Sequence, residues 1–176
     1  MDSKTYLQAS ARTASTQFHE DIVSPAMLEQ ALHDAISAGQ NADAIKKSLF
    51  YGKALDTAHP TQSLQTADSN LNTQALAPDV LHAALGLYTE ATELLEAVLA
   101  TMQGQNFDAV NAFEECGDIE WYLAMLYRNL NRSPEEAKAA NIKKLMARYP
   151  EKFEHSQAVE RDLEKEREIL ESHHRG

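Results

Sequence analysis

The sequence predicts an all-α protein. The chain contains 27 Ala and 20 Leu but only 5 Val and 6 Ile, so residues that favour helices far outnumber those that favour strands. No stretch alternates apolar and polar side chains for long enough to indicate a strand. A length of 176 residues is typical of one domain, so we interpret 1–176 as a single domain.

The first elements are marked by one clear start signal. Residues 4–18 have few large apolar side chains and predict a weakly formed helix. Ser24 followed by Pro25 is typical of a helix start, because Ser caps the free N–H groups and Pro fits the first turn. We expect this helix to end at Gly39 and a second, short helix to follow as far as Gly52.

After Gly52 the chain has one long polar stretch, followed by stronger helical patterns. Residues 57–77 are polar without an apolar face, which indicates a surface loop. Apolar residues at helical spacing predict long helices over 79–102 and 107–130. A Ser-Pro-Glu-Glu start predicts a third helix over 133–149, and a charged helix is expected over 155–174.

Charge and composition exclude several classes of protein. The formal net charge of -11 argues against binding to a nucleic-acid polymer, which requires a positive surface. No apolar run approaches the ~20 residues that span a membrane. Cys116 is the single cysteine, so there is no disulfide framework. No secretory signal follows Met1, and we expect a cytoplasmic protein.

Two pairs of acidic residues have the spacing of one helix face. Glu90 and Glu93 lie three apart in one predicted helix, and Glu115 and Asp118 lie three apart in the next. The short connection at 103–106 favours an antiparallel hairpin. In such a hairpin both pairs lie at a similar distance from the turn, so four carboxylates can meet between the helices.

A divalent cation would relieve the repulsion among four such acids, and ligands that are all oxygen favour Mg²⁺ or Mn²⁺. The alternative is an acidic helix face exposed to solvent. Two features favour the metal site. The acids neighbour large apolar residues, and no Lys or Arg occurs between 81 and 127.

Several segments carry a family resemblance. They read GLYTEATELLE at 86–96, EECGDIEWYLA at 114–124, NIKKL at 141–145 and RYPEKF at 148–153. Together they resemble the MazG-type all-α nucleoside triphosphate pyrophosphohydrolases over roughly residues 82–165. The last segment and the charged tail are most similar to phage-encoded members.

The resemblance implies a MazG-like four-helix bundle, here with additional N-terminal helices, a charged C-terminal helix and a catalytic core at about 79–153. It implies a homodimer or a dimer of dimers, which leucines on more than one helix face also favour. It implies hydrolysis of a nucleoside triphosphate to monophosphate and pyrophosphate. The Mg²⁺ ligands that it implies are Glu90, Glu93, Glu115 and Asp118.

The sequence departs from the family at the first acidic motif. Many relatives have Glu immediately before the first ligand and Gly two residues after it, where this chain has Thr89 and Thr92. The additional Glu is therefore missing. The remaining candidates for the general base are Glu90 and Glu96.

Basic residues supply candidate phosphate contacts. Asn141, Lys144 and Arg148 share one helical face and can donate to anionic oxygens. The alternative is a solvated basic stripe paired with Glu135 and Glu136. Lys53 is a further candidate. It belongs to a Lys-rich segment, 46–56, that resembles one lying between the acidic motifs of phage relatives but here precedes both.

These observations predict a metal-dependent (d)NTP pyrophosphohydrolase. Analogy with phage relatives that cleave (d)GTP favours a purine, and a phage-encoded enzyme would act in the host cytoplasm. One alternative is a dUTPase-like or dCTPase-like member of the same fold. Another is a noncatalytic helical interaction protein whose acidic cleft binds a basic partner.

Overall fold

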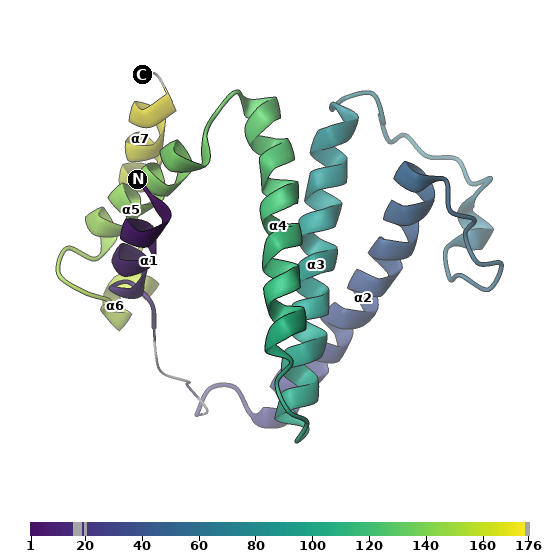
Figure 1. Cartoon of the computed structure of the whole chain (residues 1–176), viewed down its shortest axis with the longest axis horizontal. Coiled ribbons are helices and arrows are strands. Elements are labelled where there is room, and N and C mark those ends of the chain that lie inside the picture. Colours follow the sequence, from purple (N-terminus) through teal and green to yellow (C-terminus); the bar gives the residue numbers. More distant parts are fainter. Residues whose placement is uncertain (16–18, 20, 175–176) are drawn as a thin grey trace. The chain divides into compact units, whose positions relative to one another are not determined.

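The computed structural model describes residues 1–15, 19 and 21–174, and within these residues it contains helices and no strand (Figure 1). The all-α prediction is confirmed. The α-helices are α1 (Ser3–Ala11), α2 (Pro25–Tyr51), α3 (Pro78–Met102), α4 (Ala109–Leu130), α5 (Pro134–Arg148), α6 (His155–Val159) and α7 (Leu163–His174).

The chain folds as two compact units. The central unit, Glu20–Asn129, contains α2, α3 and α4. The terminal unit combines Met1–His19 with Leu130–Gly176 and contains α1, α5, α6 and α7. The single-domain assignment and the MazG-like bundle stay predictions, and each unit is described here by itself.

Helix α2 is longer than the sequence pattern indicates. The Ser24 hydroxyl accepts a hydrogen bond from the Met27 N–H at 3.3 Å, and the helix ends at Gly52, which adopts the left-handed conformation. The predicted end at Gly39 is wrong, because α2 continues through this residue. Gly39 is buried, and a Cβ atom there would overlap the Thr92 side chain of α3. This glycine therefore permits close packing of α2 on α3.

Helices α3 and α4 form the predicted hairpin (Figure 1). A buried apolar cluster joins them and consists of Ala83, Tyr122 and Met125, with Leu87 and Leu126 packed against it. Gly86 of α3 faces the Tyr122 ring, and a Cβ atom at Gly86 would overlap that ring. The ring thus lies directly against the α3 backbone.

In the terminal unit, α1 and α7 pack on α5. Helix α5 begins with the predicted capping box, in which Ser133 and Glu136 exchange side-chain and backbone hydrogen bonds of 3.1 and 2.7 Å. The predicted continuous helix over 155–174 is wrong, because α6 and α7 are separate. Asp162 accepts a hydrogen bond from the Lys165 N–H at 3.0 Å and so caps a new helix.

The remaining segments are the long loop after α2 and the N-terminal helix. Residues 57–77 are mostly exposed, and their only regular element is the 3₁₀ turn η1 (Gln62–Leu64), which confirms the predicted loop. The predicted helix over 4–18 is too long, because α1 ends at Ala11 and residues 12–15 are not helical; residues 16–18 lie outside the described residues. None of the described helices has both the length and the apolar character that a membrane crossing requires.

Candidate metal centre

Three of the four predicted ligands converge in the central unit. Glu90 comes from α3, and Glu115 and Asp118 come from α4. Each of these three residues offers a carboxylate oxygen, and the three oxygens lie within 4.8 Å of one another. Glu90 and Glu115 are buried, whereas Asp118 is exposed. The i, i+3 spacing on two facing helices therefore brings three of the four predicted ligands together, without Glu93.

The cluster lies in an open cleft of about 320 Å³. Six carboxylates and two lysine ammonium groups line this cleft, so acidic groups predominate. The lining residues are Asp43, Lys46, Lys47, Tyr51, Glu90, Glu93, Asn111, Glu114, Glu115, Asp118 and Tyr122. The fourth predicted ligand, Glu93, is thus in the same cleft, at an exposed position.

Two carboxylates of this cleft, Glu93 and Glu115, are repelled by neighbouring acids. Burial raises the pKa of Glu115 to about 7, and the charges of Glu93, Glu90 and Asp118 reinforce that shift. Burial also raises the pKa of Glu93, as does the charge of Glu90, while Lys47 opposes the shift. Negative charge on the neighbouring acids thus opposes ionisation of both Glu93 and Glu115. A cation among them would remove the repulsion, so this donor set fits Mg²⁺ or Mn²⁺.

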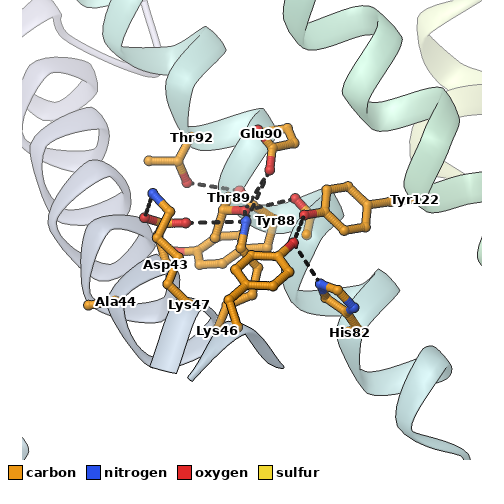
Figure 2. Close-up of polar contacts among 12 residues, drawn as sticks. Asp43, Ala44, Lys46, Lys47, His82, Tyr88, Thr89, Glu90, Thr92 and Tyr122 are labelled. Atoms are coloured by element: carbon orange, nitrogen blue, oxygen red, sulfur yellow. Dashed lines mark hydrogen bonds and ion pairs between the residues drawn. The ribbon is translucent and has the colours of Figure 1, made fainter. Parts of the chain in front are cut away.

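The structure adds a basic residue that the sequence analysis missed. Lys46 of α2 donates hydrogen bonds to Glu90 Oε1 at 3.1 Å and to Thr89 Oγ1 at 2.6 Å (Figure 2). Its ammonium also lies 3.2 Å from Asp43 Oδ1 and 5.3 Å from the centre of the Tyr122 ring. The stretch 81–127 has no Lys or Arg, but Glu90 obtains a lysine partner from 44 residues earlier in the chain.

Asp43 and Lys47 extend the same wall of the cleft. Lys47 forms an ion pair with the second oxygen of Asp43. Burial opposes ionisation of Asp43, but hydrogen bonds from Lys47 and Lys46 outweigh it and hold the pKa of Asp43 below its usual value. For Lys46, burial would lower the pKa, but the bonds to Glu90 and Asp43 raise it well above the usual value. Lys46 is therefore charged throughout the physiological range.

Aromatic side chains form one end of the site. The Tyr51 hydroxyl lies 3.0 Å from His82 Nε2 and 3.4 Å from the Tyr122 hydroxyl. Phe50 stacks on His82 with ring centres 4.1 Å apart. Burial lowers the pKa of His82, and the charge of Lys46 lowers it further. His82 is thus a neutral, packed residue beneath the cleft.

Two of the other predicted site residues, Glu96 and Lys53, do not line this cleft. Glu96 accepts a hydrogen bond from Gln40 at 2.8 Å and does not line the cleft, whereas Glu90 does. Lys53 follows the end of α2, is exposed and does not line the cleft either.

Asn141, Lys144 and Arg148 lie on α5, in the terminal unit rather than the unit that contains the acids. Within that unit the Arg148 guanidinium is held by Glu166, with bonds of 2.7 and 2.6 Å. Glu135 and Glu136 lie at the other end of α5, in its first turn.

Two sequence signals could have indicated the wall formed by α2. Asp43, Lys46 and Lys47 are i, i+3 and i+4 neighbours, so they share one face of the helix. Lys46 also follows Gly39 by two helical turns, which places it on the side of α2 that faces α3. The packing role of Gly39 had to be recognised first.

No protein-family model, curated protein or solved structure matches this chain.

Proposed function

We propose that the chain is a metal-dependent nucleoside triphosphate pyrophosphohydrolase. The observation that carries this proposal is the convergence of Glu90, Glu115 and Asp118, whose ligand oxygens lie within 4.8 Å of one another. Glu115 is buried and shares the cleft with Glu93, so the fold holds carboxylates close enough to repel one another. Such an arrangement is explained by a cation that binds there.

The chemistry of the cleft agrees with an anionic substrate bound together with a metal ion. A bound Mg²⁺ supplies charge neutralisation at phosphate oxygens and activation of a water molecule. The lysines at positions 46 and 47 provide positive charge to the same cleft. Lys47 has the more exposed side chain and is therefore the better placed of the two to contact phosphate oxygens.

The substrate class rests on the family resemblance. We favour a (d)NTP with a purine base, (d)GTP above all, which is cleaved between the α- and β-phosphates. A dUTPase-like or dCTPase-like activity uses the same metal chemistry. The base preference therefore remains the first quantity to measure, and Tyr51, at the aromatic end of the cleft, is a candidate contact for it.

A second candidate function is a noncatalytic interaction module. The observation that favours it is the exposed acidic rim formed by Glu93, Glu114 and Asp118, which could contact a basic partner. This candidate predicts binding without turnover and no requirement for a metal ion.

The test is a panel of common ribonucleoside and deoxyribonucleoside triphosphates with Mg²⁺ or Mn²⁺, followed by phosphorus NMR. We expect monophosphate and pyrophosphate from one or a few nucleotides. Glu120→Gln, an exposed residue on α4 outside the cleft, is the matched control for changes in the acids. Orthophosphate with diphosphate, or no metal-dependent turnover of any nucleotide, would contradict the proposal.

We also propose that the active form is a homodimer or a tetramer. Helix α4 exposes large apolar side chains at helical spacing, with Val110 81%, Phe113 82% and Trp121 54% exposed in the single chain. Gly117, which lies between them, leaves open space for a second surface. Light scattering after gel filtration should give at least twice 19.6 kDa; a monomer at micromolar concentration contradicts this prediction.

A further inference from the structure

Lys46 is an unusual residue for a metal-binding cleft. The whole residue is 3% exposed, although its side chain ends in a charge. Three oxygen atoms surround the ammonium group, one each from Asp43, Thr89 and Glu90, at 2.6–3.2 Å. The contacts with Thr89 and Glu90 are hydrogen bonds, and the contact with Asp43 is an ion pair.

Glu90 is the residue that links this environment to the metal centre. Its Oε1 accepts from Lys46, and the Thr89 hydroxyl lies 3.1 Å from the same oxygen. Glu90 also belongs to the set of three residues whose oxygens lie within 4.8 Å. The same carboxylate therefore faces an ammonium group on one side and the candidate cation position on the other.

We propose that Lys46 is a built-in counter-ion of the metal centre, which neutralises Glu90 in the metal-free protein and weakens the binding of a divalent cation. This inference rests on the metal centre of the proposed function. The ammonium reduces the negative charge that Glu90 presents to the ion and repels the ion directly. Because Lys46 is buried, water screens this repulsion only slightly.

The other lysine of the cleft provides an internal comparison. Lys47 carries the same charge one residue later, but its side chain is 39% exposed and its ion pair is with Asp43. Solvent therefore screens its effect on a bound ion. Replacing Lys46 and Lys47 in turn separates the contact with Glu90 from the general charge of the cleft.

The experiment measures Mn²⁺ binding to the full chain by calorimetry at about pH 8, where exposed carboxyl groups are ionised. Lys46→Met keeps most of the side-chain volume and removes the charge. We expect its dissociation constant for Mn²⁺ to be about tenfold lower than that of the wild type. Lys47→Met should change it by less than about threefold, and Lys46→Arg, which keeps the charge, should not tighten binding.

A folding measurement accompanies the binding experiment, because Lys46→Met leaves Glu90 without a counter-ion. Circular dichroism with and without Mn²⁺ should show that the metal raises the melting temperature more in this variant than in the wild type. Lys46→Gln keeps a hydrogen-bond donor and provides a second uncharged variant. A variant that folds only when Mn²⁺ is present also supports the proposal, since the ion then replaces the ammonium.

The outcomes separate the two proposals. If Mn²⁺ binds neither the wild type nor any variant, the metal centre itself is wrong. If Mn²⁺ binds the wild type, and both uncharged variants bind it no more tightly, the role of Lys46 is wrong. If both variants stay unfolded with Mn²⁺ present, the ammonium has a structural role that a metal ion cannot replace, which also overturns the inference.

Discussion

Two buried glutamates, one in each unit, have opposite electrostatic environments. Glu115 in the central unit is 3% exposed, and Glu166 in the terminal unit is 7% exposed. Burial and neighbouring acids raise the pKa of Glu115 to about 7. Hydrogen bonds from Arg148 and Arg161 lower the pKa of Glu166 to about 2. Similar burial therefore accompanies shifts of opposite sign.

The difference shows how a structural acid can be distinguished from a candidate ligand. Glu166 has its partners within the chain, with bonds of 2.7 and 2.6 Å to Arg148 and 2.8 Å to Arg161. Glu115 is surrounded mainly by other acids and has no such pair. Glu166 therefore needs no ligand from outside the chain, whereas the repelled charge of Glu115 indicates one.

The largest expected effect is that of Glu115→Gln. The amide removes one metal-ligand charge, so we expect turnover to fall by about 100-fold or more and Mn²⁺ binding to weaken by about tenfold or more. Removing a repelled charge should leave the stability unchanged or slightly higher. Turnover assays, calorimetry and urea denaturation measure the three quantities. Activity close to that of Glu120→Gln would refute the assignment.

Glu166→Gln should show the reverse pattern. It leaves the partly buried Arg148 without its bidentate partner, and we expect a loss of roughly 2–3 kcal/mol in the free energy of unfolding. Mn²⁺ binding should be unchanged, because α7 belongs to the other unit. Urea denaturation followed by circular dichroism gives the first quantity. Unchanged stability would show that Glu166 does not stabilise the fold through its arginine partners.

The smallest expected effect is a dependence of stability on pH. Because the pKa of Glu166 is lowered in the folded state, its contribution is complete above its ordinary value of about 4.5 and declines as the pH falls towards 2. Between pH 7 and pH 3 we expect a loss of about 1–2 kcal/mol, since solvent screens the half-exposed Arg161. The difference in stability between wild type and Glu166→Gln should shrink over the same range; a constant difference contradicts it.

The sequence predicts the carboxylate cluster because its signal is local. Residues three apart share a helix face wherever the helix lies, and a short turn fixes the register of the next helix. The contact between Lys46 and Glu90 spans 44 positions and depends on how α2 packs on α3. Helical periodicity carries no information about that packing.

Gly39 is a second case in which the sequence pattern does not reveal how α2 packs on α3. A glycine after an apolar helical pattern is a reasonable stop signal, since glycine is common just beyond helix ends. Here it is retained inside α2 because Thr92 occupies the space that a side chain would need. A glycine that ends a helix and a glycine that allows close helix packing look the same in the sequence. Only the tertiary structure shows which role Gly39 has.

The contact between Gly86 and Tyr122 has a consequence for the choice of ion. Gly86 lies one helical turn before Glu90, and Tyr122 lies one turn after Asp118, so this contact sets the separation of α3 and α4 beside the ligands. Oxygen ligands surround Mg²⁺ at about 2.0–2.1 Å and Ca²⁺ at about 2.3–2.6 Å. A single methyl group at position 86 would push the helices apart and enlarge the ring of oxygens. We therefore expect Gly86→Ala to weaken any preference of this cluster for Mg²⁺ over Ca²⁺.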